Sequence, residues 1–300
     1  MAILADANSR ILVQGMSNPM ARFQCEEMLR HGSNLVGVVA RPDEVRNWSM
    51  PPLPVFQTMQ TAVRASGATL VMIFSPPLEV KAAVSDAIAA RLPVIVCLTD
   101  HIPVHDAIVL RHLAAQAGVV LVGASSSGIL SPGRAKAGFF VEDICQPGDI
   151  GVVAKGGSLA YAVISELKSA GLGVSTVVSL GGDAAKGLDF AGCLALFAKD
   201  AETRAVVMLG EIGGSDEEKA AAFLRAHPIH KPVVAFISGR SVPVGRSMGH
   251  AGAIAAAGRG DYDSKCRALA AAGVEIADTI GAIAQILAAG GPQWAPGARG

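Results

Sequence analysis

The sequence has little charge of either sign and no excess of basic over acidic residues. Only 17% of its 300 residues are charged, and 25 Lys and Arg balance 25 Asp and Glu. A neutral chain lacks the positive field that attracts nucleic acids or the anionic surface of a membrane. We therefore expect no nucleic-acid partner and no membrane association.

Long hydrophobic runs are also missing, although 51% of the residues are hydrophobic and the mean hydropathy is +0.44. Charges and glycines interrupt every apolar stretch before it reaches the length of a membrane-spanning helix. The hydrophobic excess is typical of parallel strands that are buried on both faces, or of a large subunit interface.

Paired cysteines and a secretory leader are absent as well. The five cysteines are widely separated and none forms a Cys-x-x-Cys pair, which argues against a metal knuckle and a disulfide framework. The first residues, Met1 to Asp6, lack the basic start and the apolar core of a signal peptide. We expect a cytoplasmic protein.

What is present is an alternation of short apolar runs with helical patterns, which predicts an α/β protein with parallel sheets. We expect a Rossmann-like domain over residues 1–123. Residues 124–149 are rich in Ser, Gly and Pro, and we expect them to form a linker with functional loops. A flavodoxin-like, doubly wound domain over residues 150–290 and a tail over 291–300 complete the prediction.

His250 is the most informative residue, because Gly249 and Ala251 leave room around its ring. Earlier in the chain, a predicted strand delivers Glu211 into a glycine-rich turn. A carboxylate can hold one imidazole nitrogen as a donor and leave the other as a neutral nucleophile. The pair suggests a histidine that carries a phosphoryl group; an ordinary surface or core histidine is the alternative.

A candidate anion site lies in the loop Ala154-Lys155-Gly156-Gly157-Ser158, where a predicted strand runs into a helix. We expect Ser158 at the N-cap position, with the backbone amides of Gly157 and Ser158 facing a phosphoryl group. A plain glycine turn is the alternative. The sequence contains no Gly-x-x-x-x-Gly-Lys-Ser/Thr motif, so we expect a partner to bind the nucleotide that donates the phosphoryl group.

Two loops of the N-terminal domain can also bind a ligand. Ser17-Asn18-Pro19-Met20 opens the first predicted helix, where Ser17 or Asn18 can act as the cap and Pro19 fits the first turn. Leu98-Thr99-Asp100 follows the fourth predicted strand and can contact a nucleotide-like group; ordinary capped turns are the alternative. No metal is expected, because no carboxylate or cysteine cluster accompanies the histidines that follow Asp100.

Three segments carry a resemblance to a known family. They are Gly181-Gly182-Asp183, Gly210-Glu211-Ile212-Gly213-Gly214-Ser215 and Met248-Gly249-His250-Ala251-Gly252-Ala253-Ile254. In this order they resemble the α subunits of succinate–CoA ligase (succinyl-CoA synthetase) and relatives such as malate–CoA ligase, from Ile3 to about Leu287. The resemblance implies an N-terminal CoA-binding domain and a C-terminal domain with a phosphorylated histidine. It also implies an ATP-grasp β subunit that supplies ATP or GTP with Mg, in an αβ or α2β2 assembly.

The resemblance implies a reaction of a small carboxylic acid, CoA and a nucleoside triphosphate to acyl-CoA, nucleoside diphosphate and phosphate. It assigns the phosphohistidine to His250 and the orienting carboxylate to Glu211. Its CoA site takes Ser17, Asn18, Pro19, Met20, Leu98, Thr99 and Asp100. Tyr161 lines up with a residue next to the organic substrate, and Ser125 lies in a second substrate loop.

Several loops depart from the family pattern. The CoA loop, usually Thr-Gly-x-x-Gly, begins here with Ser17-Asn18, and the usual lysine after the second strand falls at Asp43, where Arg41 can replace it. Ser125 replaces the asparagine of a Gly-Pro-Asn-Cys-x-Gly loop. Three interpretations stay open: a succinate ligase, a ligase for malate or another substituted acid, and a regulatory relative with altered CoA binding. An NAD-dependent dehydrogenase fits less well, because the glycine fingerprint is broken.

Overall fold

The computed structural model describes residues 2–46, 48, 53–243, 245–246, 248–250, 252–254 and 260–290. Its internal contacts divide the chain into two compact units. The N-terminal unit contains residues 4–142 and 179–188, and the C-terminal unit contains residues 143–178 and those from 189 onwards, with residues 2–3.

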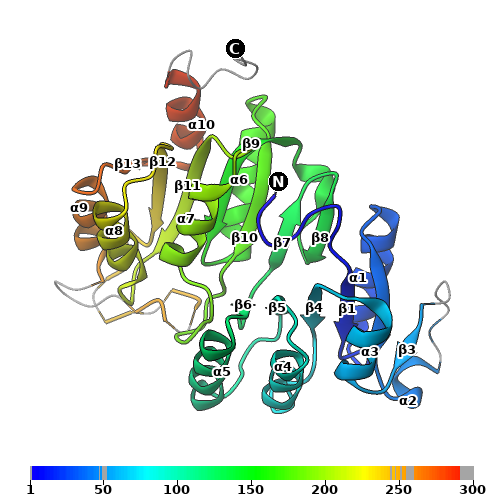
Figure 1. The fold of residues 1–300 in the computed structure, drawn as a ribbon. Coiled ribbons are helices and arrows are strands. Elements are labelled where there is room, and N and C mark those ends of the chain that lie inside the picture. Colours follow the sequence, from blue (N-terminus) through cyan, green and yellow to red (C-terminus); the bar gives the residue numbers. More distant parts are fainter. Residues whose placement is uncertain are drawn as a thin grey trace. The chain divides into compact units, whose positions relative to one another are not determined.

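The N-terminal unit is built on a parallel sheet of six strands (Figure 1). These are β1 (Ile11–Gln14), β2 (Leu35–Val39), β3 (Val55–Phe56), β4 (Leu70–Ile73), β5 (Val94–Cys97) and β6 (Val120–Val122). Their spatial order β3-β2-β1-β4-β5-β6 is that of a Rossmann fold, which confirms the predicted fold class. Every residue of β4 and β5 is buried, which explains why these strands are uninterrupted apolar runs.

The helices of this unit are α1 (Pro19–Arg30), α2 (Pro42–Val45), α3 (Met59–Ser66), α4 (Val80–Ala89) and α5 (Val104–Ala117). The start of α1 and the end of α5 lie at residues suited to those positions. At the start of α1, the Asn18 side chain accepts a hydrogen bond from the backbone of Met20 (3.0 Å), and Pro19 takes the first position, as predicted. Helix α5 ends at Gly118, whose φ of 67° is the left-handed conformation that terminates helices.

The segment expected to be a linker contains a β-hairpin instead. Strands β7 (Gly128–Ser131) and β8 (Ala135–Gly138) pair antiparallel and are buried, and the short helix η1 (Glu142–Ile144) follows. Ser126 donates a hydrogen bond to the carbonyl of Ser179 (2.6 Å), and the amide of Gly187 donates to the carbonyl of Gly123 (2.9 Å). These bonds explain why residues 179–188 belong to the N-terminal unit, a division that the Ser- and Gly-rich composition did not reveal.

Replacing Gly181 by Ala is expected to reduce the free energy of unfolding by about 2–5 kcal/mol, because strain and overpacking add. Gly181 has a φ of +100°, and a Cβ there would lie 1.9 Å from the carbonyl oxygen of Ala124. Gly118→Ala is the matched control, since Gly118 has a φ of +67° with nothing within 4 Å of a Cβ. Urea unfolding of both variants measures the difference, and equal losses would contradict the close approach.

The C-terminal unit is built on five strands in the order β13-β12-β11-β9-β10. They are β9 (Pro147–Ala154), β10 (Val174–Ser179), β11 (Ala205–Glu211), β12 (Val233–Ser238) and β13 (Glu275–Ile276). Strand β11 pairs parallel with β9 and β12, and β12 pairs parallel with β13. Counted along the chain, this is the 2-1-3-4-5 order of flavodoxin-like sheets, as predicted, and its switch point lies between β9 and β11.

Helices cover the faces of this second sheet (Figure 1). They are α6 (Gly157–Ser169), α7 (Phe190–Lys199), α8 (Asp216–Ala226), α9 (Tyr262–Ala270) and α10 (Ile280–Ala289). Helix α6 packs beside α10, whereas α7, α8 and α9 pack in a row, so the sheet is doubly wound. Aspartates cap α7 and α9: Asp189 accepts from the amide of Gly192 (2.9 Å) and Asp261 from that of Ser264 (2.7 Å).

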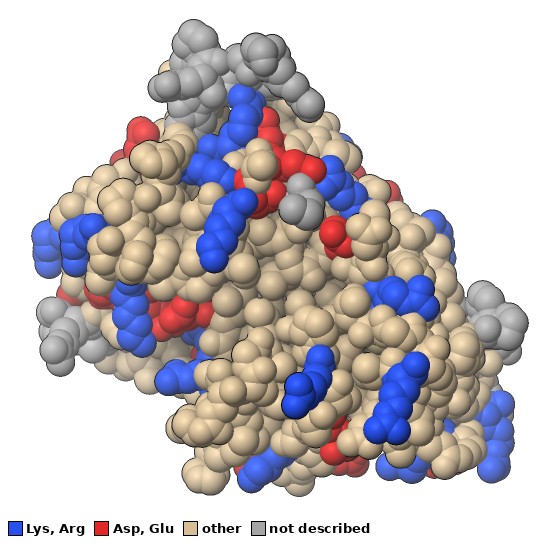
Figure 2. All heavy atoms as spheres, in the orientation of Figure 1, with Lys and Arg blue, Asp and Glu red and all other residues tan. Residues whose placement is uncertain are grey.

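The surface agrees with the balanced composition. Figure 2 shows Lys and Arg side chains scattered among uncharged surface on the face drawn, with Asp and Glu side chains between several of them. The described helices all fall short of the length and apolar character that crossing a bilayer requires.

Candidate active site

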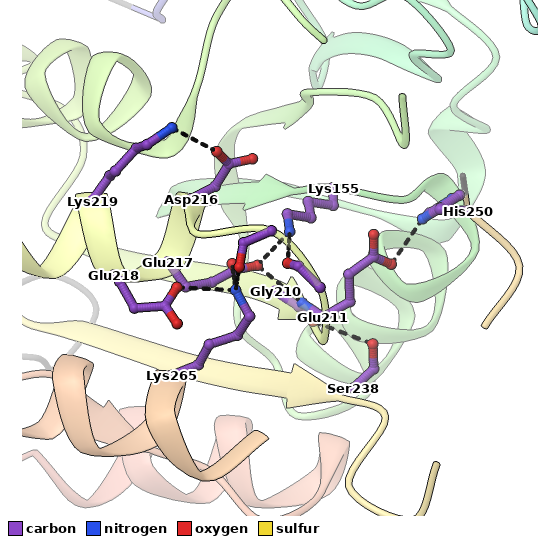
Figure 3. Close-up of polar contacts among 12 residues, drawn as sticks. Lys155, Gly210, Glu211, Asp216, Glu217, Glu218, Lys219, Ser238, His250 and Lys265 are labelled. Atoms are coloured by element: carbon purple, nitrogen blue, oxygen red, sulfur yellow. Dashed lines mark hydrogen bonds and ion pairs between the residues drawn. The ribbon is translucent and has the colours of Figure 1, made fainter. Parts of the chain in front are cut away.

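The carboxylate of Glu211 holds the ring of His250 (Figure 3). Glu211 ends β11 with its side chain only 8% exposed, and its Oε2 lies 2.7 Å from Nδ1 of His250, whose side chain is 34% exposed. The contact lies beyond the carboxyl end of β11, which adjoins the switch point of the sheet, where ligands of such folds bind. A buried carboxylate at this distance favours the tautomer with its proton on Nδ1, so that Nε2 carries the lone pair.

The same ring lies against the start of α6, the helix that follows β9. A Cβ on Gly156 would lie 2.6 Å from Cε1 of His250 and 3.3 Å from Nε2, so only a glycine leaves room for the ring in this position. Gly156 is the N-cap, and no side chain caps the helix. No acidic residue lies in the first turn of α6, so the positive helix end is not neutralised there.

The structure corrects the expected position of Ser158. Gly156 takes the extended backbone of an N-cap (φ −109°, ψ 148°), and the helix begins at Gly157, so Ser158 is the second helical residue and is exposed. Glycine is among the residues favoured at an N-cap, so Gly156 takes this position without a capping side chain. Gly157 and Ser158 therefore both belong to the first turn, whose amides have no acceptor within the helix.

A glycine turn joins Glu211 to the loop that carries His250. Gly213 has a φ of +89°, and a Cβ there would lie 2.1 Å from the carbonyl oxygen of Gly252. The amide of Gly213 donates to the carbonyl of Gly260 (2.7 Å). The glycines after Glu211 thus allow two loops that are distant in sequence to touch.

Sequence reasoning missed a buried ionic cluster behind Glu211 (Figure 3). The carboxylate of Glu217, with a fully buried side chain, lies 2.9 Å from Nζ of Lys155 and also pairs with Nζ of Lys265, another fully buried side chain. Lysines and glutamates on helices are usually solvated, so α8 and α9 gave no signal in the sequence. Lys155 lies in the predicted anion loop, but the sequence of that loop does not indicate that Glu217 is its partner.

Tyr161 lies on α6, the helix that begins beside His250. Its side chain is half-buried, and burial raises the pKa of its phenol. Tyr161 therefore stays a neutral hydroxyl at physiological pH.

In the N-terminal unit, a cavity of about 390 Å³ lies where β1, β4 and β5 end. It is lined by Ser17, Asn18, Pro19, Phe74, Ser75, Pro76, Pro77, Leu98, Thr99, Asp100 and Phe139. The structure thus brings six of the predicted CoA-site residues together at the switch point of a Rossmann sheet. Met20, which follows Pro19 in the predicted CoA loop, is 45% exposed and does not line the cavity.

Two other predicted residues are positioned by their neighbours. Arg41 does not line the cavity; its guanidinium lies 3.8 Å from Asp43 and 3.6 Å from Glu44. Ser125 has a φ of +57°, and its amide donates to the carbonyl of Thr99 (3.1 Å), which ties the substrate loop to a residue of the cavity. Among the residues that the structure describes, no group of three His, Cys, Asp or Glu is placed to hold a metal ion.

Comparison with known proteins identifies both halves of the chain. The CoA binding domain family matches residues 6–101, and the CoA-ligase family matches residues 153–275. The chain is 41% identical to succinate–CoA ligase [ADP-forming] subunit alpha 2 of Archaeoglobus fulgidus, over 96% of this chain and 99% of that one. It is 36% identical to the corresponding alpha subunit of Staphylococcus aureus, over 96% and 94%.

Solved structures show the same fold at lower identity. ATP citrate lyase from Methanothrix soehngenii has a TM-score of 0.83 and 21% identity over 95% of this chain. A dinucleotide forming acetyl-coenzyme A synthetase from Ca. Korarchaeum cryptofilum has a TM-score of 0.74 and 21% identity over 91%. This chain spans 51% and 58% of those two chains, so it corresponds to roughly half of each.

Proposed function

Because the chain belongs to the family of succinate–CoA ligase α subunits, we propose that it is the α subunit of a ligase that couples acyl-CoA formation to cleavage of a nucleoside triphosphate into its diphosphate and phosphate. The acid is a small carboxylate, with succinate as the first candidate. The observation that carries the proposal is the 2.7 Å contact between Glu211 and His250 beside the open start of α6. The working form is a cytoplasmic αβ or α2β2 assembly with an ATP-grasp β subunit that holds ATP or GTP with Mg.

In the first step, Nε2 of His250 attacks the γ-phosphorus, and the bond to the β–γ bridging oxygen breaks as the nucleoside diphosphate leaves. Glu211 accepts the proton of Nδ1 in a hydrogen bond, which keeps Nε2 nucleophilic and stabilises the positive charge that develops on the ring. The energy of the nucleotide is then stored in the phosphorus–nitrogen bond while the other ligands bind.

The first turn of α6 supplies hydrogen bonds to the phosphoryl oxygens. The amides of Gly157 and Ser158 point out of the helix start, and the helix dipole contributes about 0.3–1 kcal/mol at an exposed site and up to about 2 kcal/mol if partly buried. Because these groups are fixed before the reaction, they need no reorganisation as charge develops.

In the second and third steps, an oxygen of the substrate carboxylate attacks phosphorus and the bond to Nε2 breaks, which yields an acyl phosphate. The CoA thiol then gives up its proton and its sulfur attacks the acyl carbon, while the bond from that carbon to the phosphate oxygen breaks and phosphate leaves. Tyr161, on the helix that begins beside His250, is our candidate for contact with the organic acid, and Ser125 of the N-terminal unit stays a prediction. Tyr161 serves as a neutral donor, in keeping with the raised pKa of its phenol.

The cavity of the N-terminal unit fits CoA. Helix α1 begins there with Asn18 as its cap and Pro19 at its first position, so its positive end can face the pyrophosphate. Leu98, Thr99 and Asp100 form the second side of the cavity, and Phe74 and Phe139 provide apolar surface. Arg41, on the neighbouring loop, offers a guanidinium for a phosphate once it leaves its two carboxylate neighbours.

The test is phosphorylation of the chain in complex with its β subunit. The two proteins are co-expressed and incubated with γ-labelled ATP or GTP, and the label on this chain is tested for lability in acid and stability in base. Label that one acid of a panel discharges together with CoA would establish the ligase and identify its substrate. Absence of label with either nucleotide in a well-formed complex would overturn the proposal.

A second candidate is a regulatory relative that keeps the fold without productive CoA binding. The engagement of Arg41 by Asp43 and Glu44 favours it, because the residue expected to replace the family's lysine is already paired. Calorimetric titration of the complex with CoA distinguishes the two, since the ligase requires CoA to bind and the relative does not.

Replacing Gly156 by Ala is expected to slow phosphorylation of His250 by about 100-fold. Any residue can adopt the backbone angles of Gly156, so the effect of the substitution comes from the added Cβ. This atom would lie 2.6 Å from Cε1 of His250. Non-bonded carbons approach to about 3.5–4.0 Å, so the ring has to move by roughly 1 Å. The labelling rate measures the effect. Gly281→Ala on α10 is the control, where a Cβ meets only Glu166 at 3.7 Å, and equal rates for the two variants would contradict the contact.

A further inference from the structure

The carboxylate of Glu217 contacts the backbone of the residue that holds the histidine. Its Oε1 accepts the amide hydrogen of Glu211 (3.1 Å) and lies 2.9 Å from Nζ of Lys155. Its other oxygen accepts from Nζ of Lys265. Glu217 thus joins α8, on which it lies, to the carboxyl end of β11, the turn before α6, and α9 (Figure 3).

The two lysines hold the turn that follows Glu211. Nζ of Lys155 donates to the carbonyl of Gly213 (3.4 Å), and Nζ of Lys265 donates to the carbonyl of Gly214 (3.2 Å). Lys265 also lies 3.1 Å from the carboxylate of Glu218. The amide of Glu211 and two carbonyls beyond it are therefore all bound by one ionic cluster.

Stability alone does not explain this cluster. Removing charges from water costs several kcal/mol per ion, and well-packed apolar residues often replace a buried ion pair without loss of stability. A charged group buried behind an active site is better explained by the geometry that it imposes. Here that geometry concerns the backbone of Glu211, whose side chain meets His250 in front.

The charges of the cluster also act on the ring. Nζ of Lys155 and Nζ of Lys265 pair with Glu217, and Nζ of Lys265 also pairs with Glu218, so two ammonium groups balance these two carboxylates. The negative charge of Glu211 then remains to stabilise the positive charge that develops on the ring during attack.

We propose that Glu217 is a positioning residue, which with Lys155 and Lys265 fixes the backbone at Glu211 so that its carboxylate meets Nδ1 of His250. The inference rests on the proposed function for its kinetic readout, but the ring tautomer can be read without it. Glu217→Gln removes the charge and keeps both the size of the side chain and an oxygen for the amide of Glu211.

The test compares variants of Glu217 and of Lys155, each with a matched control. In the complex with its β subunit, Glu217→Gln and Lys155→Met are expected to lower the rate of His250 phosphorylation 10- to 100-fold. Lys155→Arg retains the charge and restores most of the rate that Lys155→Met loses. In the full chain with ¹⁵N-labelled histidines, the ring signals of His250 are expected to shift from the Nδ1–H tautomer towards a mixture in the two impaired variants.

Asp200→Asn is the control for loss of a buried carboxylate, because Asp200 is 6% exposed and binds Thr203 beyond the end of α7. If Glu217→Gln lowers Tm as this control does, but leaves the ring signals and the phosphorylation rate at wild-type values, the positioning role is overturned. If the wild-type complex takes up no label, the proposed function fails, and the ring signals alone decide the role of Glu217.

Discussion

His250→Asn is expected to reduce labelling of the chain by γ-labelled nucleotide to background and to lower acyl-CoA formation by at least about 1,000-fold. An asparagine amide can still donate a hydrogen bond to Glu211, so the carboxylate keeps a partner. It has no nucleophilic nitrogen, because the amide lone pair is delocalised. The reaction therefore loses the covalent intermediate, while the fold loses little.

His230→Asn provides the control, since His230 is an exposed histidine of the same unit. It should label at the wild-type rate and with the same lability in acid. Label that persists on the His250 variant would show that another side chain accepts the phosphoryl group.

Glu211→Gln is expected to lower the rate of phosphorylation by about 100- to 10,000-fold. The glutamine amide can turn to donate a hydrogen bond to Nδ1, which moves the ring proton to Nε2, the atom that has to attack. The buried position of Glu211 fits the isosteric amide, so the loss is expected in the rate rather than in folding.

The rate of single-turnover labelling and the ¹⁵N signals of the ring check this result together. A slow variant whose ring carries its proton on Nε2 would support the tautomer argument. If the labelling rate of Glu211→Gln lies within threefold of the wild-type rate, some other group orients the ring.

Most of the fold follows from patterns that the sequence displays directly. Strands β4 and β5 are unbroken apolar runs because both faces are covered. Asn18 caps the start of α1, and Gly118 ends α5. The β7–β8 hairpin was not predicted, because small and polar residues there give no alternation. Its strands are nevertheless buried, since the unit covers them.

Only those residues of the site whose role is indicated by their neighbours in the sequence could be predicted. Small residues around His250 and a carboxylate at a strand end identified two groups that the structure places 2.7 Å apart. The N-cap was misplaced by two residues, because glycine is also among the residues favoured at an N-cap. Glu217 and Lys265 could not be found at all, because their burial depends on how α8 and α9 pack.

The inclusion of residues 179–188 in the N-terminal unit has a consequence for synthesis of the protein. Chains fold as they emerge from the ribosome, usually one domain after another. Here the first unit cannot be completed when residue 142 emerges, because Ser179 and Gly187 supply bonds to its loops. The nascent chain has to extend through β10 to residue 188 before its first unit closes, so neither unit can be separated from the other by a single cut in the gene.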